Sequence, residues 1–174
     1  AVDAVVDTAT IQVGDRDFNT VVTQVTSSGA DAVFFGGYYQ EAGLLVSQLR
    51  DGGFEAPFVA GDGVLDPGFV ETAGGAAADG SFLTCPCGPP TPEFTEAYEA
   101  SAGQAPGTYS AEGYDVMNMY LAGLDAGNTD RESMLTFIDG YDDAGITKQI
   151  VFDDAGDIAE VTVYSYPVEG GTLD

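Results

Sequence analysis

The chain has 174 residues and is strongly acidic, because 29 Asp and Glu residues face four Lys and Arg residues and give a formal net charge of −25. This balance argues against binding to nucleic acid or to anionic lipid, since both require clustered basic side chains. The sequence has no histidine, which excludes the usual nucleophile–histidine catalytic pairs and histidine metal sites. A hydrophobic content of 44% fits a folded protein of one domain or two small lobes.

Three features bear on the compartment. No apolar run approaches the roughly 20 residues of a membrane helix, and the sequence begins at Ala1 without a signal peptide, so we expect a mature or trimmed product. The only cysteines are Cys85 and Cys87, in LTCPCGPP. They are too few for a structural zinc site without outside ligands, which leaves a local disulfide, free thiols or pairing with a partner outside the segment.

The first half of the sequence alternates between strand and helix patterns. Apolar runs predict strands at residues 4–8, 32–35, 57–60 and 81–84. Helical spacing predicts helices at residues 17–28, 41–51 and 67–73, and glycines follow the first two. The run at 32–35 lacks polar alternation, which is typical of a strand buried on both faces. The order βαβαβαβ predicts an α/β fold with a parallel sheet and crossover helices.

The second half is richer in helix. Thr91 and Pro92 predict the start of one helix, and Ser110 that of a longer one. The longer helix carries an apolar stripe of Tyr114, Met117, Leu121 and Leu124. Thr129 and Glu132 predict a capping box for a third helix that ends near residue 138.

These three helices precede any predicted strand. The next strands lie in QIVFDDAGDIAEVTVYSYPV, where a turn-rich segment joins two of them. Amphipathic helices need a sheet or another helix to cover, and this chain supplies little of either. We therefore infer from the sequence that part of the fold is missing.

Two motifs resemble known sites and lack the required spacing. FDDAGDIAE gathers Asp153, Asp154 and Asp157 around Gly156, but the ligand spacing of a calcium-binding loop is absent, so turn chemistry explains it better. FFGGYY lacks the G-x-G-x-x-G pattern of a dinucleotide site, and the chain has no phosphate-loop lysine. We expect no metal and no cofactor.

A third pattern combines a tyrosine and a carboxylate. Tyr38 follows the strand at 32–35, and Asp62 follows the strand at 57–60 between two glycines. Open α/β sheets bind ligands beyond the carboxyl ends of their strands, so both side chains would reach one crevice. The alternative is that Asp-Gly forms an ordinary turn.

Three segments resemble one family: GDRDFNTVVTQVTSSGADAVFFGGYYQEAGLLVSQLRDGGF, FVAGDGV and GTYSAEGYDVMNMYLAGL. They are similar to the periplasmic leucine/isoleucine/valine-binding proteins, which are solute receptors of branched-chain amino-acid ABC transporters with the type I periplasmic binding fold. The likeness covers nearly the whole chain in order. The most specific part is GGYYxExG, with an acidic residue 24 positions after its first tyrosine.

The resemblance implies roles for individual residues. In that family two α/β lobes close over a free amino acid. The residues matching Tyr38 and Asp62 hold the ammonium group, and the aromatic residue matching Tyr109 lines the side-chain pocket. A buried ammonium must be paired, and an aromatic wall buries an aliphatic side chain at about 25 cal/mol per Å². Tyr39 would pack between the lobes.

The chain departs from the family pattern in two ways. The family commonly has glutamate at the position of Asp62, so this carboxylate reaches one methylene less far. The chain also starts in the middle of the pattern and lacks the hydroxyl-rich loops that receive the ligand carboxylate. By resemblance, residues 1–84 belong to the C-terminal lobe and 85–160 to the N-terminal lobe, and 161–174 return. Cys85 and Cys87 then lie in a lobe crossover, where a local disulfide would stiffen the hinge.

The resemblance therefore implies the C-terminal half of an extracytoplasmic receptor, periplasmic or anchored at the cell surface. It would deliver a branched-chain or other small apolar amino acid to an ABC permease by lobe closure, without catalysis. Its helices would be covered by a missing N-terminal half or by self-association. One alternative is a ligand-sensing domain of a signalling receptor with this fold. An aspartate-based hydrolase is the weakest alternative, because histidine, a nucleophile elbow and metal ligands are lacking.

Overall fold

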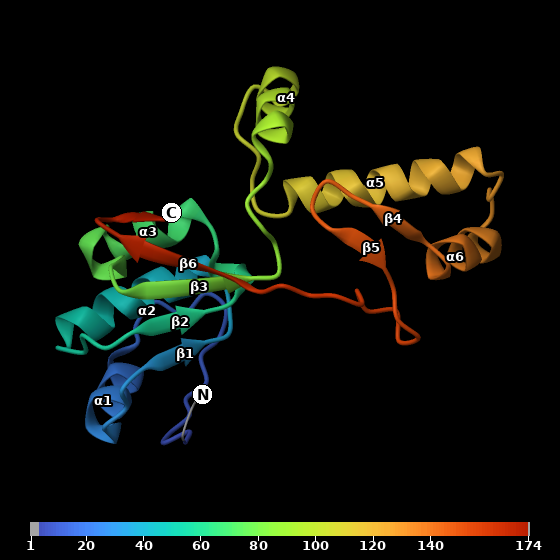
Figure 1. Cartoon of the computed structure of the whole chain (residues 1–174). Helices are drawn as coiled ribbons and strands as arrows, with labels where there is room; N and C mark the ends of the chain where they lie inside the picture. Colours follow the sequence, from blue (N-terminus) through green and yellow to red (C-terminus); the bar gives the residue numbers. More distant parts are fainter. Residues whose placement is uncertain (1–3, 174) are drawn as a thin grey trace. The chain divides into compact units, whose positions relative to one another are not determined.

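The computed structural model describes residues 4–173 and divides into two compact units (Figure 1). The first unit comprises the residues up to Cys85 and those from Tyr164 onward, and the second comprises Pro86–Val163. The lobe boundaries expected from the sequence fall after residues 84 and 160. The chain thus leaves the first unit once and returns to it after the second is complete.

The first unit is built on a five-stranded sheet in the order β1-β2-β3-β6-β7. Strands β1 (Val33–Phe35), β2 (Phe58–Ala60) and β3 (Ser81–Cys85) are parallel, as the sequence predicts. Strand β6 (Tyr164–Glu169) pairs antiparallel with β3, and β7 (Thr172–Leu173) pairs antiparallel with β6. The returning segment therefore completes the sheet that the first half of the chain begins.

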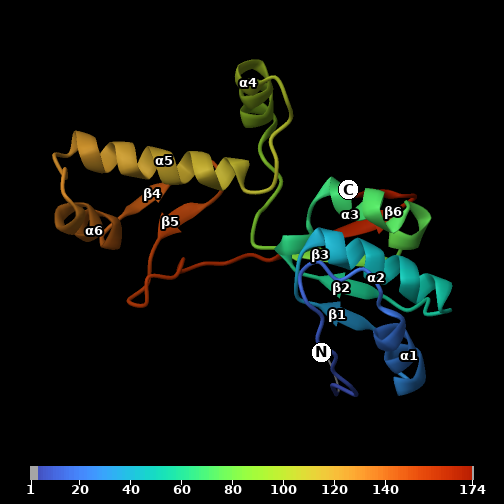
Figure 2. The same ribbon diagram turned by 180° about the vertical axis from the view of Figure 1, so that it is seen from behind.

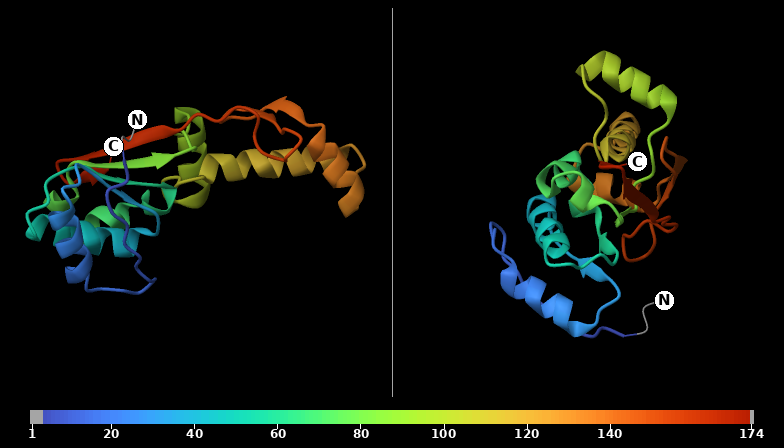
Figure 3. Two further views of the ribbon diagram at one scale, coloured as in Figure 1. Left: turned by 90° about the horizontal axis from the view of Figure 1, so that it is seen from below. Right: turned by 90° about the vertical axis from the view of Figure 1, so that its left-hand side faces the viewer.

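The helices of this unit lie on one side of the sheet, as Figures 2 and 3 show. They are α1 (Asn19–Ser28), α2 (Tyr39–Asp51) and α3 (Pro67–Ala73), with short 3₁₀ turns η1 (Asp62–Val64) and η2 (Ala76–Ala78). Gly29 ends α1 in the left-handed conformation that glycine adopts without steric cost. Asp66 begins α3 by accepting a hydrogen bond from the Gly68 N–H.

Aromatic rings form the centre of the core under this sheet. The Phe58 ring stacks between Phe35 at 5.9 Å and Phe69 at 6.1 Å. Helices α2 and α3 approach closely because Gly43 has no side chain, and a Cβ there would lie 2.7 Å from the Thr72 Cβ. Each large apolar side chain buried in this way contributes about 1.5–3 kcal/mol.

The opposite face of the sheet is bare within the first unit. The strand register places Phe34, Val59, Phe82 and Pro167 side by side across four strands. Phe34 is 73% exposed, so the expectation that residues 32–35 are buried on both faces is wrong. Among the described residues of this unit, helices cover only one face of the sheet.

The predicted strand at residues 4–8 is also wrong. These residues have no regular secondary structure, and Val5 stays 75% exposed. A strand needs a neighbour to satisfy its backbone groups, and β1 pairs only with β2 in the described part of the chain. Local β-propensity alone does not hold a strand.

The second unit contains three helices and a hairpin. They are α4 (Pro92–Ala102), α5 (Ser110–Asp125), α6 (Arg131–Asp139), β4 (Asp142–Ala144) and β5 (Gln149–Val151). Strands β4 and β5 pair antiparallel, and β4 lies in a segment where the sequence predicts no strand before Ile150. The Thr91 hydroxyl caps α4 by accepting from the Phe94 N–H, as predicted.

Two predicted helix caps differ in the structure. Tyr109 precedes α5 in a left-handed conformation, and Ser110 is the first helical residue rather than the cap. Asp130 caps α6 and forms the capping box with Ser133, one residue beyond the predicted pair of Thr129 and Glu132. Both candidate pairs have the same spacing of three residues. In the structure the Asp130 carboxylate accepts hydrogen bonds from the Glu132 and Ser133 N–H groups.

Helix α5 buries small residues rather than its apolar stripe within this chain. Its buried residues are Ala111, Asp115, Met119 and Gly123. The apolar stripe is exposed, as shown by Met117 at 58% and Leu121 at 48%, which agrees with the expectation that this chain supplies little to cover it. Small residues face α6, where a Cβ on Gly123 would lie 2.6 Å from the Met134 sulfur.

The acidic segment at residues 152–160 forms a turn. The Asp153 carboxylate accepts hydrogen bonds from the Ala155 and Asp157 N–H groups, and a β-bridge joins Phe152 to Ile158. Among residues 4–173, no three potential metal ligands lie together. Across the same range, no helix has both the length and the apolar character that spanning a bilayer requires.

Candidate functional site

Tyr38 lies where β1 passes into α2. Gly36 and Gly37 separate it from Phe35, and it is the residue that precedes α2, in an extended conformation. A Cβ on Gly37 would lie 2.7 Å from the Phe35 ring, so the loop runs directly over the aromatic core. Tyr38 itself is 60% exposed. Its ring is therefore available to a ligand at the carboxyl end of β1.

Asp62 lies at the equivalent point after β2. It is two residues beyond Ala60, which pairs in register with Phe35, and it begins the 3₁₀ turn η1. The turn is closed by the Val64 N–H donating to the Gly61 carbonyl at 3.0 Å. The exposed Asp62 and Tyr38 thus follow two neighbouring parallel strands whose ends are level.

The two loops contact each other through Gly63. A Cβ on this residue would lie 2.6 Å from the Gly37 carbonyl oxygen and 3.4 Å from Cδ1 of Tyr38. The turn that carries Asp62 is therefore packed against the loop that carries Tyr38. The sequence predicts that both residues reach one edge of the sheet, but it does not reveal Gly63 as the point of contact.

Tyr39 has a packing role inside the first unit. A Cβ on Gly68, at the start of α3, would lie 2.6 Å from Cε2 of the Tyr39 ring. This contact joins the start of α2 to α3 within the first unit, and the expected packing of Tyr39 between lobes stays a prediction. The adjacent tyrosines are thus used differently, because Tyr39 is half-buried against a helix and Tyr38 projects from the sheet edge.

The N-terminal end of α2 also organises the loop that precedes α1. The buried Glu41 carboxylate accepts from the Gly14 N–H at 2.7 Å. Further along α2, the Gln48 side-chain oxygen accepts a hydrogen bond from the Phe18 N–H, and its amide nitrogen donates to the Arg16 carbonyl. Glu41, the acidic residue of GGYYxExG, therefore has a structural partner in this chain.

Tyr109 belongs to the second unit. It is the only non-glycine residue with a positive φ, at 65°, among residues 4–173, and it is 39% exposed. The left-handed conformation costs roughly 1–2 kcal/mol for an L-residue. Its carbonyl accepts from the Gly113 N–H at 2.8 Å, so the first turn of α5 holds it in place. Such retained strain is typical of functional positions.

The Cys-Pro-Cys segment lies where the chain passes from the first unit to the second. Cys85 and Cys87 are disulfide-bonded and both are buried. The Lys148 ammonium donates to the Pro86 carbonyl at 3.2 Å, so one of the four basic residues of the chain binds this segment. The cysteines are therefore assigned to structure rather than to metal binding or nucleophilic chemistry.

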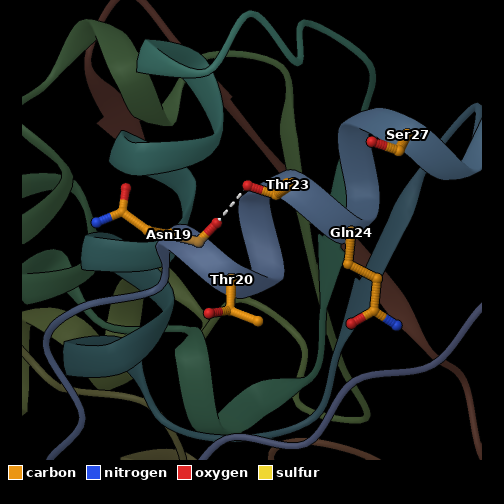
Figure 4. A pocket seen from close by; sticks show the side chains of 5 residues that line it. All are labelled: Asn19, Thr20, Thr23, Gln24 and Ser27. Carbon is orange, nitrogen blue, oxygen red and sulfur yellow. Dashed lines mark hydrogen bonds between the residues drawn. The ribbon is translucent and has the colours of Figure 1, made fainter.

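A depression along α1 is less suited to a ligand. Its lining is polar and comes from Asn19, Thr20, Thr23, Gln24 and Ser27 (Figure 4). All five belong to one face of a single helix, and Thr23 donates to the Asn19 carbonyl of its own helix. No second element contributes a converging group to this lining, so it offers no enclosed binding site.

The geometry of the first unit suits recognition of a cation. A carboxylate can pair with an ammonium group, and a phenol can accept a hydrogen bond from it. Neither loop contains a histidine or a cysteine. The arrangement therefore offers two oxygen acceptors to a cation.

Comparison with known proteins gives the family. The profile of a family described as periplasmic binding protein matches residues 2–172. The chain belongs to the periplasmic binding protein family. It is similar to the leucine-, isoleucine-, valine-, threonine- and alanine-binding protein of Pseudomonas aeruginosa, at 28% identity over 90% of this chain and 43% of the relative.

Solved structures agree with this assignment. A leucine binding protein LivK from Thermotoga maritima superposes with a TM-score of 0.81 at 29% identity, over 94% of this chain and 49% of that one. The substrate binding protein LivJ from Streptococcus pneumoniae, solved in complex with isoleucine, gives 0.82 at 26% identity with the same coverage. The fold is therefore that of the type I periplasmic binding proteins, as predicted. This periplasmic binding protein chain spans about half the length of these relatives.

Proposed function

We propose that the protein to which this chain belongs is an extracytoplasmic receptor of an ABC transporter, and that it binds a branched-chain or other small apolar amino acid between two lobes. The observation that carries this proposal is the contact of Gly63 with the Tyr38 loop, which keeps Tyr38 and Asp62 at one sheet edge. Tyr38 and Asp62 would hold the ammonium group, and Tyr109 would form part of the apolar pocket.

The ligand class is inferred from relatives. One relative is named for binding leucine, isoleucine, valine, threonine and alanine, and one similar structure holds isoleucine. The shorter reach of Asp62, compared with the glutamate usual in the family, favours a bridging water or a displaced ammonium group. The disulfide supports an oxidising compartment, where such bonds persist.

The direct test is calorimetric titration of the complete gene product with amino acids, comparing wild type with Asp62→Asn. Removing one partner of a buried ammonium–carboxylate pair costs roughly 2–5 kcal/mol of affinity. Asp51→Asn is the matched control, because Asp51 is exposed at the far end of α2. A loss below about 1 kcal/mol for Asp62→Asn would contradict the assigned role.

The proposal includes macromolecular partners. We expect an ABC permease as the recipient of the ligand, and a missing N-terminal half or a second copy as the cover for the exposed apolar surface of α5. Tyr114, Met117, Leu121 and Leu124 recur along that helix at spacings of three and four residues, each 48–58% exposed, as on a helix with an unfilled contact face.

The cover can be identified by measuring mass. Sedimentation of the 174-residue chain alone should give a dimer or larger species if self-association covers α5. A monomer that becomes more stable on addition of the remaining part of the gene product would assign the cover to that part. Transport of the ligand into cells that carry the cognate permease, and its loss without the receptor, would test the permease partner.

A further inference from the structure

We propose that Gly63 is a positioning residue for the ligand site, because its missing side chain lets the turn after β2 close onto the loop after β1. The expected effect of Gly63 on ligand affinity rests on the proposed function. The contact itself is a property of the first unit and can be measured without a ligand.

The proposal starts from the space around Gly63. A Cβ there would be 2.6 Å from the Gly37 carbonyl oxygen, closer than real Cβ atoms come to a backbone atom. The obstructing atom belongs to the main chain, so rotation of a side chain cannot relieve the contact. Any other residue at position 63 must push the two loops apart by roughly half an ångström, because protein interiors accommodate added atoms poorly.

The Gly37 loop cannot yield freely toward the sheet. A Cβ at Gly37 would itself lie 2.7 Å from the Phe35 ring, which stacks with the Phe58 ring at 5.9 Å. Phe35 and Phe58 are 7% and 0% exposed. The aromatic core therefore sets the height of the Gly37 loop, and Gly63 sets the distance of the Asp62 turn from that loop.

Gly63 thus controls two candidate ligand contacts at once. It directly follows Asp62, and its Cβ position is 3.4 Å from the Tyr38 ring. A binding group must be held within about 0.5 Å of its productive position to keep its effect. Separation of the loops would move the carboxylate and the phenol apart, so that one ammonium group could not contact both well.

The matched pair of variants is Gly63→Ala and Gly61→Ala. Gly63 is absent from the residues with positive φ, and Gly61 has φ of −85°, so alanine is compatible with the backbone at both positions. A Cβ on Gly61 meets nothing within 4 Å. The two variants add the same methyl group to the same turn, and only one of them meets the Gly37 carbonyl.

Amino-acid affinity of the complete gene product is the first readout. We expect Gly63→Ala to bind at least about tenfold more weakly and Gly61→Ala to bind like wild type. Equal affinities for the two variants would overturn the proposal.

The second readout separates positioning from a general loss of structure. Tyr38→Phe keeps the ring and removes the hydroxyl, so the effect of Gly63→Ala should shrink in the Tyr38→Phe background if Gly63 acts through that hydroxyl. An undiminished effect in that background would mean that Gly63→Ala does not act by positioning the Tyr38 hydroxyl, and would overturn the proposal that Gly63 holds both ligand contacts.

A third readout needs neither ligand nor folded variant. In wild-type protein, NMR should show a nuclear Overhauser effect between the Gly63 α protons and the Tyr38 ring, and its absence would overturn the proposal even if Gly63→Ala fails to fold. If wild type binds no amino acid while this contact is present, the proposed function fails and the positioning of the two loops stands.

Discussion

The two units of this chain bury their apolar side chains to very different extents. In the first unit Phe18, Phe58 and Phe69 are at most 1% exposed, and three helices share one core under the sheet. In the second unit α4 and α6 contain no buried residue. Helices thus form in both units from local caps and spacing, but only the first has a substantial core of its own.

The largest expected effect comes from opening that core. Phe58→Ala should lower the free energy of unfolding of the first unit by about 3–5 kcal/mol, because it removes the middle ring of the stack and leaves a cavity. Phe34→Ala, on the bare face of the same sheet, should change it by no more than about 0.5 kcal/mol. Urea unfolding, monitored through hydrogen exchange of the β2 amides, measures both changes in the free energy of unfolding. Equal losses would show that the bare face is covered in solution.

A smaller loss is expected where the second unit is held by polar contacts. The buried Asp115 carboxylate accepts from the N–H groups of Ile146 and Thr147 and from the Thr147 hydroxyl. Asp115→Asn turns one acceptor into a donor, and should cost roughly 1–3 kcal/mol by leaving an N–H group unpaired. The amides of Ile146 and Thr147 should then exchange faster with solvent.

Asp125→Asn supplies the control for that variant. Asp125 is exposed in the last turn of the same helix, where losing a negative charge is neutral or slightly favourable. If the amides of the β4–β5 turn exchange as slowly in Asp115→Asn as in wild type, the hairpin does not depend on this carboxylate.

The smallest effect is a pH dependence at the start of α6. The Ser133 N–H, the Ser133 hydroxyl and the Glu132 N–H lower the pKa of the Asp130 carboxyl. A lowered pKa means that the cap stabilises the helix at neutral pH, and that this contribution is lost as the pH falls below about 4 through the lowered pKa.

The measurement must be local, because acid also relieves the repulsion within a chain of net charge −25. NMR can follow both the protonation of the Asp130 carboxyl and the exchange of the α6 amides. The protection of these amides should fall over the same pH range in which Asp130 becomes protonated. Asp130→Asn also caps helices but does not titrate. Protection in that variant should be independent of pH in this range, and a pH dependence equal to wild type would refute the assignment.

The sequence predicts the first unit well, because its signals are local. Uninterrupted apolar runs and glycine caps locate β1, β2, β3 and the three helices. Parallel strands end at one edge, so the nearness of the Tyr38 and Asp62 loops could be foreseen from their positions after two strands. The segment at residues 4–8 has the same local signal and fails, because strand formation depends on a neighbour.

Other features could not be predicted from sequence spacing. The capping box of α6 has two candidate registers, and only the backbone path selects Asp130 over Thr129. The left-handed conformation of Tyr109 breaks the preference of its residue type, so nothing local indicates it. Tyr109 entered the candidate site through resemblance alone. Gly63 is one of 24 glycines, and its role depends on a carbonyl 26 positions earlier in the chain.

The antiparallel pairing of β3 with β6 has a consequence for folding of the protein. Leu83 pairs with Tyr166, and the whole second unit lies between them in sequence. When the chain emerges N-terminus first into the compartment where it folds, β3 therefore presents an open edge until the second unit has followed and β6 can add to it. Unpaired strand edges recruit other chains. The time for which this edge stays open is thus set by how long residues 86–163 take to emerge.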